Sequence, residues 1–241
     1  MNSIKTQSNS PLVGQMFEAG AHFGYDKSRR HPSVSKFIFG RKDNFEIFDL
    51  EKSAEKLQIA KDFAKKVGTE GRQILFVGGK KEAQNAIKLG AEKIDMPYVD
   101  GRWIGGTLTN FEEIRKRVKR YLDLTMQKEK GLLAKYTKKE RLMIDRELEK
   151  LDRRFSGVSN MEVKPAALFI VDANKEYIAR DEAIQTHIPV ISLSGSDNDF
   201  TKINYAIPAN DSLSKSIKFF VDQIVASYEE GLKERKTAAV K

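Results

Sequence analysis

Short apolar runs separated by longer amphipathic stretches constrain the fold of this chain more than any other feature of its sequence. The later runs contain almost no polar residue, which is typical of strands buried on both faces of a parallel sheet. Apolar residues at helical spacing fill the intervals between them. This alternation predicts an α/β layered domain, with strands in the runs 37–40, 45–50, 74–79, 96–101, 167–173 and 188–193 and helices over 54–67, 83–94, 175–185 and 212–232.

Residues 111–155 interrupt this alternation. The segment holds 15 Lys and Arg against 9 Asp and Glu, and it is much too long for a single crossover helix. Two narrow apolar stripes, within 114–124 and 142–151, flank a turn near Gly131 and indicate two antiparallel helices. We therefore expect a projecting coiled-coil hairpin over 108–155, inserted into a discontinuous α/β domain of residues 1–107 and 156–232, with a flexible basic tail over 233–241.

The balance of charge restricts the kinds of partner that the chain can bind. Lys and Arg outnumber Asp and Glu by 43 to 34, for a formal net charge of +9. Such a chain favours polyanions, nucleic acid first and an anionic membrane surface second. The absence of cysteine excludes disulfides, thiolate zinc sites and cysteine nucleophiles. The sequence has no apolar run typical of a signal peptide or a membrane span, so we expect a cytoplasmic or organellar matrix protein.

The stretch Arg102 to Asn110, RWIGGTLTN, places the only tryptophan of the chain beside two glycines and in front of the charged segment. One interpretation is a backbone and a flat ring laid against a large anion. The other is a strand-to-helix turn with a tryptophan in the core. We expect Trp103 to pack the base of the hairpin onto the α/β body, Gly105 and Gly106 to allow a sharp turn, and Asn110 to cap the following helix.

Two features suggest small-molecule chemistry, and each has a simpler explanation. The run ILFVGGKK, 74–81, resembles a phosphate-binding loop, but its glycines are adjacent and no Ser or Thr follows the lysines. A glycine turn before a surface helix is favoured over nucleotide binding, and a contact of Lys80 or Lys81 with an RNA phosphate is a third option. Asp49, Asp100 and Asp172 follow expected strands at the carboxyl edge of the sheet, where α/β enzymes build their sites. They lack a convincing catalytic partner, so we attribute them to helix caps and turns.

The segment 19–42, AGAHFGYDKSRRHPSVSKFIFGRK, intersperses six cations with four aromatic residues. Cations pair with phosphates and planar side chains stack on bases, so this pattern is typical of RNA binding. The alternative is a solvated basic loop whose phenylalanines belong to the core. The phenylalanines can be core residues in either case.

A series of motifs runs through the chain: AGAHFG, RRHP, KFIFGRK, FDLEKS, ILFVGGKKEA, RWIGGTLTN, YTKKERLMIDRELEKL, KPAALFIVDANKE, IPVI and AIPAND. In their order and spacing they resemble the bacterial-type small-subunit ribosomal protein number two family, and RWxGGxLTN is highly specific to it. The resemblance covers residues from about 12 to 232. It implies a Rossmann-like, three-layer α/β domain with a protruding antiparallel coiled-coil hairpin. It also implies binding to 16S rRNA on the solvent side of the small subunit, between head and body, and docking of the large mRNA-binding ribosomal protein number one.

This resemblance implies a structural, non-enzymatic component of the cytoplasmic ribosome, whose partners are 16S rRNA and other small-subunit proteins. We predict no cofactor, metal, membrane or small-molecule substrate. The rivals are an α/β enzyme acting on a phosphorylated small molecule at Gly78, Gly79, Lys80 and Asp172, and a free RNA-binding regulator outside the ribosome. The expected rRNA contacts are Lys27, Arg29, Arg30, Lys36, Arg41, Lys80, Arg102, Arg115, Lys116, Lys119 and Arg120.

The chain departs from the family pattern in several places. Tyr25 follows Gly24 where the family usually has a second histidine. The loop from Gly195 to Phe200 replaces a usual Asp-Thr-Asn and Asp-Pro, PAND replaces Pro-Gly-Asn-Asp before the last helix, and the chain ends in a basic ERKTAAVK instead of an acidic tail. None of these positions lies in RWIGGTLTN.

Overall fold

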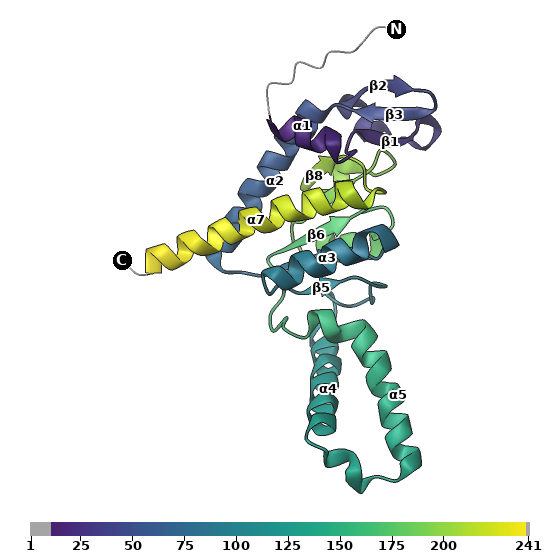
Figure 1. The fold of residues 1–241 in the computed structure, drawn as a ribbon, viewed down its shortest axis with the longest axis vertical. Helices are drawn as coiled ribbons and strands as arrows, with labels where there is room; N and C mark the ends of the chain where they lie inside the picture. Colours follow the sequence, from purple (N-terminus) through teal and green to yellow (C-terminus); the bar gives the residue numbers. More distant parts are fainter. Residues whose placement is uncertain (1–10, 240–241) are drawn as a thin grey trace.

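A parallel five-stranded sheet and a separate antiparallel three-stranded sheet form the frame of the molecule in the computed structural model, which describes residues 11–239 (Figure 1). No helix within these residues has the length and apolar character that a membrane crossing requires. The elements are α1 (Pro11–Glu18), β1 (Phe23–Asp26), η1 (Lys27–Arg29), η2 (Pro32–Phe37), β2 (Ile38–Lys42), β3 (Phe45–Phe48), α2 (Leu50–Glu70), β4 (Ile74–Val77), α3 (Lys81–Lys93), β5 (Tyr98–Val99), α4 (Phe111–Glu129), η3 (Leu132–Lys135), α5 (Lys138–Phe155), η4 (Ser156–Val158), β6 (Ala167–Val171), α6 (Tyr177–Gln185), β7 (Val190–Ser194), η5 (Phe200–Lys202), β8 (Tyr205–Pro208) and α7 (Ser214–Ala239).

The large sheet has the strand order β5-β4-β6-β7-β8, and every neighbouring pair is parallel. Its central strands β4, β6 and β7 are buried along their whole length. This confirms the prediction of a parallel sheet covered on both faces, because only double coverage buries strands without polar alternation.

Two hydrophobic cores lie on opposite faces of the large sheet. Ile74 and Phe76 of β4 belong to the core that α2, α3 and α7 complete, and Figure 1 shows these helices over one side of the sheet. Leu75 and Val77 belong to the second core, which includes residues of α6 and the base of α4. Successive residues of a strand point to opposite faces. The result is a layered, Rossmann-like α/β body.

The small sheet has the order β1-β3-β2 and consists of antiparallel pairs. The runs 37–40 and 45–50 were expected to be strands, and most of their residues form β2 and β3, joined by a turn at Asp43 and Asn44. The sequence did not predict β1 or β8. Both contain only four residues, and each includes a residue that is unfavourable in strands, Gly24 in β1 and Pro208 in β8.

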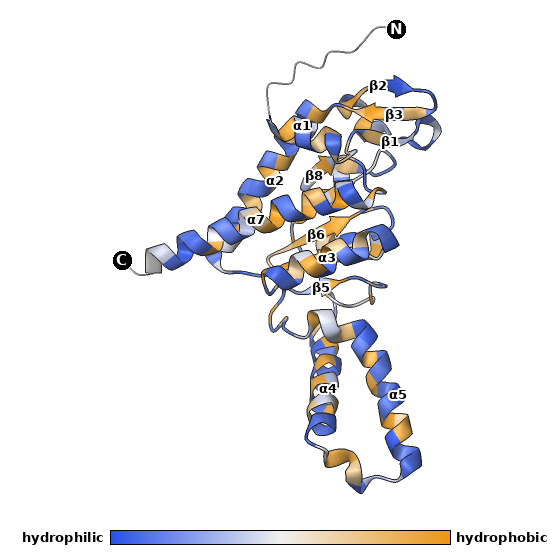
Figure 2. Cartoon of the chain, in the orientation of Figure 1, coloured by the Kyte–Doolittle hydropathy of each residue, from blue (hydrophilic) through white to orange (hydrophobic). Residues whose placement is uncertain are grey.

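Helices α4 and α5 project away from the two sheets as an antiparallel pair (Figure 1). Polar pairs link them along their length, from Tyr121 Oη to Asp152 Oδ1 at 2.7 Å to Lys128 Nζ and Asp145 Oδ1 at 2.8 Å. Leu142, in the expected apolar stripe, is 51% exposed. Most residues of both helices are hydrophilic (Figure 2).

The last helix is longer than the sequence indicated. α7 continues to Ala239, so most of the segment 233–241 that was expected to be a flexible tail is helical, and residues 240–241 lie outside the described part. At the start of this extension α7 still contacts α2, where Lys65 Nζ lies 2.6 Å from Glu234 Oε1.

Candidate nucleic-acid interface

The loop that carries RWIGGTLTN connects β5 to α4 at the base of the projecting helices. Trp103 is only 5% exposed and belongs to the second core together with Ile114 of α4 and Phe155 of α5. Gly106 has φ +91°, a conformation that favours glycine. This geometry supports the expectation that Trp103 packs the base of the hairpin onto the body.

A buried carboxylate from α6, Glu182, holds this loop in shape. Its Oε1 accepts hydrogen bonds from Trp103 Nε1 at 3.1 Å and from the Gly106 amide at 2.8 Å. Its Oε2 accepts from the amides of Leu108 at 3.0 Å and Thr109 at 3.3 Å, and from the Thr109 hydroxyl at 3.3 Å. Burial alone would raise the pKa of Glu182, but these donors outweigh it and lower the pKa below its usual value.

The sequence reasoning missed Glu182. Asn110 does occupy the N-cap position of α4, yet its side chain makes no capping hydrogen bond, and the carboxylate of Glu182 accepts the amides that precede the helix. A signal was present, because Glu182 lies beside Ala183 and three residues after Ala179, on the buried face of α6. A lone acid on an apolar helix face requires a partner elsewhere in the fold.

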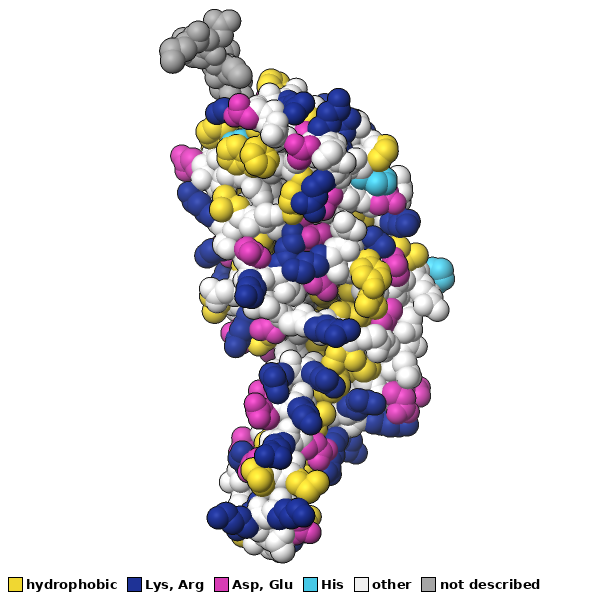
Figure 3. Space-filling model, turned by 90° about the vertical axis from the view of Figure 1, so that its right-hand side faces the viewer, with side chains coloured by type: hydrophobic (Ala, Val, Ile, Leu, Met, Phe, Trp, Pro, Cys, Tyr) yellow, Lys and Arg dark blue, Asp and Glu magenta, His cyan; other side chains and the backbone are white. Residues whose placement is uncertain are grey.

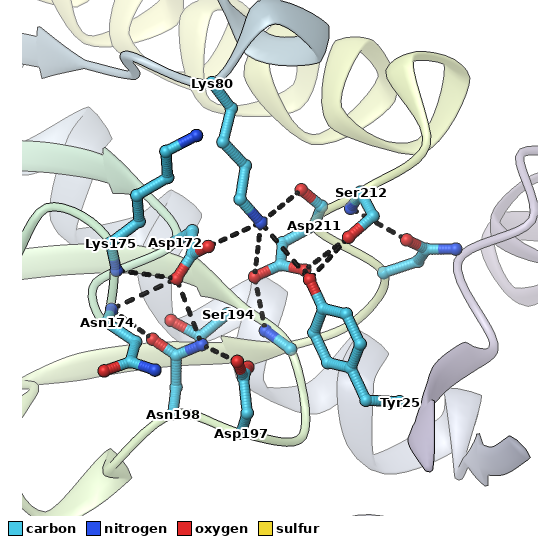
Figure 4. Close-up of polar contacts among 12 residues, drawn as sticks. Tyr25, Lys80, Asp172, Asn174, Lys175, Ser194, Asp197, Asn198, Asp211 and Ser212 are labelled. Atoms are coloured by element: carbon cyan, nitrogen blue, oxygen red, sulfur yellow. Dashed lines mark hydrogen bonds and ion pairs between the residues drawn. The ribbon is translucent and has the colours of Figure 1, made fainter. Parts of the chain in front are cut away.

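A second polar cluster lies at the carboxyl edge of the large sheet, centred on Lys80 (Figure 4). Lys80 Nζ lies 2.5 Å from Asp172 Oδ2 and 3.5 Å from Asp211 Oδ2, and donates to Tyr25 Oη at 3.3 Å and to the Asp211 carbonyl at 3.2 Å. Burial lowers the pKa of Lys80, but the two carboxylates prevail and raise it. Burial and the charge of Asp172 raise the pKa of Asp211 to about 6.

The residues that suggested a phosphate-binding loop or an active site already form hydrogen bonds and ion pairs within the protein. The Lys80 side chain is only 10% exposed and already paired, so we withdraw it from the expected rRNA contacts. The amide of Gly79, which a phosphate loop would present to its ligand, donates to Glu176 Oε1 at 3.1 Å. Among residues 11–239, no group of three acidic or histidine side chains is placed to hold a metal ion.

Two of the aspartates at the strand ends, Asp49 and Asp172, accept hydrogen bonds from backbone amides. Asp49 is the N-cap of α2 and accepts from the amides of Glu51 and Lys52. Asp172 has φ +63° and accepts from the amides of Asn174 and Lys175. For these two positions, the explanation by helix caps and turns is confirmed.

Two departures from the family pattern meet in this cluster. Tyr25 Oη donates to Asp211 Oδ1 at 3.1 Å and shares a hydrogen bond of 2.6 Å with Ser212 Oγ. A Cβ atom at Gly195 would lie 2.7 Å from the Tyr25 ring, so the glycine makes room for the tyrosine. The Tyr25 amide also donates to Ser196 Oγ at 2.9 Å. Tyr25 thereby ties β1 of the small sheet to the edge of the large sheet.

Most of the remaining expected contacts are exposed cations in two regions. Arg30 is an exception, since it pairs with the buried Glu46 at 2.9 Å, and Arg115 is half-buried and donates to the carbonyl of Met161 at 3.0 Å. Figure 3 shows Lys and Arg side chains spread over the hairpin and the adjoining body. The exposed members of the expected set are Lys27, Arg29, Lys36 and Arg41 around the small sheet and Arg102, Lys116, Lys119 and Arg120 around the base of the hairpin.

Comparison with known proteins adds an independent observation. The sequence profile of the family described as Ribosomal protein S2 matches residues 16–231. The chain is 41% identical over 222 residues to the small ribosomal subunit protein uS2 of Coprothermobacter proteolyticus, covering 92% of this chain and 83% of the relative. It is 40% identical over 230 residues to the uS2 protein of Christiangramia forsetii, covering 95% and 77% respectively.

Proposed function

Because the chain belongs to the ribosomal protein S2 family and is thus a structural, non-enzymatic component of the small ribosomal subunit, we propose that it binds 16S rRNA at the head–body junction on the solvent side. We further propose that it helps to dock the large mRNA-binding ribosomal protein number one. As a ribosomal protein it acts in translation in the cytoplasm, in association with rRNA and other ribosomal proteins. Family membership over nearly the whole chain is the observation that carries this proposal.

The two regions of exposed cations supply the physical basis for rRNA binding. Each Lys or Arg that pairs with a phosphate releases condensed counterions, which gives affinity without sequence selectivity. The regions lie on separate parts of the chain, the loops around the small sheet and the base of α4. Two spaced contact regions on a rigid body can select the shape of a folded RNA, which is the main source of recognition for structured RNA.

The projecting helices extend this surface. We propose that α4 and α5 act as a coiled-coil arm whose base is held by Trp103 and by the hydrogen bonds to Glu182. Buried donors that all converge on one carboxylate restrict the conformations of the loop. The arm, which carries Lys119 on α4, would then keep one orientation relative to the sheet and to the cation of Arg102.

Incorporation into small subunits tests the proposal. We would express the tagged chain and a variant in which Lys27, Arg29, Lys36 and Arg41 are alanine, and measure by sucrose-gradient sedimentation the fraction that travels with the small subunit. The matched control replaces four exposed lysines by alanine on α2, α3 and α7, the helices that cover the other face of the large sheet from α6: Lys66, Lys93, Lys218 and Lys233. We expect incorporation to fall several-fold only in the first variant. If the unmodified chain remained at the top of the gradient, it would be a free RNA-binding regulator instead.

A further inference from the structure

Four phenylalanines at the small-sheet end of the molecule are exposed although other phenylalanines nearby are buried. Phe17 is 59%, Phe23 43%, Phe39 68% and Phe45 56% exposed, whereas Phe48 of the same sheet is 1% exposed. The fold therefore does not use these four rings as core. Clustered exposed apolar side chains on a soluble protein mark interaction surfaces.

The strand register places the central members of this group on one face. In β1, Phe23 lies opposite Ile47 of β3, and in β2, Lys42 lies opposite Phe45 of β3. Because alternate residues of a strand share a face, Phe23, Phe45 and Lys42 lie on the outer face, away from the buried Phe48. Two exposed aromatic side chains and a cation therefore share the outer face of the small sheet.

Further planar groups continue this surface toward α1. The Phe17 ring stacks on the His22 ring at 4.4 Å between centroids and 11° between planes, and the His22 ring lies 4.0 Å from that of Phe23. Burial and the charge of nearby Lys42 lower the pKa of His22. The imidazole thus stays neutral at physiological pH. Its ring lies between the two phenylalanines, stacked on that of Phe17 and inclined by 40° to that of Phe23.

The chemistry of the surface favours one occupant. We propose that the outer face of the small sheet, defined by Phe23, Phe45 and Lys42 and continued by Phe17, stacks unpaired bases of the small-subunit rRNA. A nucleotide offers a flat base for the rings and a phosphate for the ammonium group of Lys42, so charge and shape are both complementary. The cations Lys27, Arg29, Lys36 and Arg41 around the same sheet attract the same ligand.

This inference rests on the proposed function but adds a ligand type, since the cations alone would bind paired and unpaired RNA alike. We would measure binding of the full-length chain to a single-stranded RNA of about eight nucleotides containing 2-aminopurine, and to an RNA duplex of about twelve base pairs. In the variant Phe23→Leu with Phe45→Leu, the side chains stay apolar but lose their rings. Single-strand affinity should fall about five-fold or more, with weaker quenching of the 2-aminopurine fluorescence, while duplex affinity stays unchanged.

Tyr177→Leu on α6 is the matched control, because that ring is 53% exposed on another element; it should bind the single strand like the unmodified chain. Phe45→Leu alone serves if the double variant does not keep its melting temperature. Unchanged single-strand affinity in the variants would overturn the inference. A second outcome would also overturn it. If small subunits containing the double variant showed unaltered chemical reactivity of the rRNA bases but lacked a neighbouring ribosomal protein, the face would dock protein and not RNA. Failure of the unmodified chain to enter small subunits would instead refute the proposed function.

Discussion

At the scale of single residues, each of the two polar clusters described above is organised around one buried charged side chain. Glu182 is satisfied by hydrogen-bond donors alone, whereas Lys80 is enclosed by two carboxylates and a phenol. A buried ion is tolerated only when its partners replace the lost water. The effect of a substitution at either site on stability should therefore depend on which buried charged or polar groups lose their partners.

Substitutions of Trp103 and Arg102, neighbours at the base of the hairpin, should affect different properties, the first stability and the second binding. Trp103→Ala empties a buried aromatic site and should lower the free energy of unfolding by about 3–5 kcal/mol, as measured by denaturant titration of the isolated protein. Arg102→Ala should leave stability nearly unchanged, because the side chain is exposed, yet weaken incorporation into small subunits. A Trp103→Ala protein with unchanged unfolding but reduced rRNA affinity would show that the ring stacks on RNA.

The Lys80 cluster should respond unequally to removal of its cation and removal of one anion. Lys80→Met leaves Asp172 and Asp211 buried together without a counter-charge and should cost about 3–5 kcal/mol. Asp211→Asn leaves the ion pair of Lys80 with Asp172 and should cost clearly less. Denaturant titration of both variants at pH 7 makes the comparison, and equal costs would contradict this account.

The same cluster predicts a pH dependence. The pKa of Asp211 is raised to about 6 in the folded protein, mainly by burial, from its usual 3.8. The folded state then binds more protons than the unfolded state between these values, so the contribution of Asp211 to stability is largest below pH 4 and is lost as the pH rises through 6. The difference in unfolding free energy between the unmodified protein and Asp211→Asn should therefore increase from pH 7 to pH 5. A difference independent of pH would mean that Asp211 is ionised in the fold throughout.

At the scale of elements, the projecting helices differ from the sheets in how they are stabilised. Their roots contribute Ile114, Val118 and Phe155 to the second core. The outer parts bury Leu124 and Leu133 outside the two cores and are joined by exposed ion pairs such as Lys128 with Asp145. Exposed pairs contribute little, about 0–1 kcal/mol each. The outer hairpin should therefore fold with the body without being required by it.

Deletion of the outer hairpin tests this division. Replacing residues 122–148 by a short glycine–serine loop retains the root residues of the core. We expect the shortened protein to unfold in one cooperative transition near the midpoint of the full chain, and to bind rRNA fragments more weakly because basic surface is removed. A broad transition or loss of near-UV circular dichroism would show that the hairpin belongs to the core.

At the scale of the whole molecule, the distribution of its net charge of +9 governs how the protein meets RNA. The cations proposed for contact are exposed in two regions, whereas the buried Lys80 and the half-buried Arg30 pair with acidic side chains within the fold. The total of 43 Lys and Arg residues therefore overstates the number of cations available to phosphate. The exposed set in the two regions is the better guide to affinity.

Salt dependence measures that number. Affinity for a structured 16S rRNA fragment should fall steeply with salt, by about three to five decades between about 50 and 200 mM if six to ten phosphates are neutralised. Replacing Lys27, Arg29, Lys36 and Arg41 by alanine should lower the logarithmic slope by about 0.7–0.9 for each phosphate that is no longer paired with a cation. The Lys66, Lys93, Lys218 and Lys233 variant should keep the full slope. An affinity insensitive to salt would refute the proposal that phosphates are the main binding partners.

The sequence by itself determined the parallel sheet, the helices around it and the helical character of the charged segment, because apolar periodicity reports local burial directly. It also indicated a core position for Trp103, and the motif RWIGGTLTN indicated the family to which the chain belongs. Only the tertiary structure revealed Glu182 as the acceptor that shapes this motif, Lys80 as an interior cation, and the pairing of Tyr25 with Gly195 and Asp211. These contacts join residues more than 50 positions apart, and hydrogen bonds at such separations depend on how the layers pack. The exposure of Phe23 and Phe45 likewise depends on strand register. The mixture of aromatic residues and cations in segment 19–42 does not specify that register.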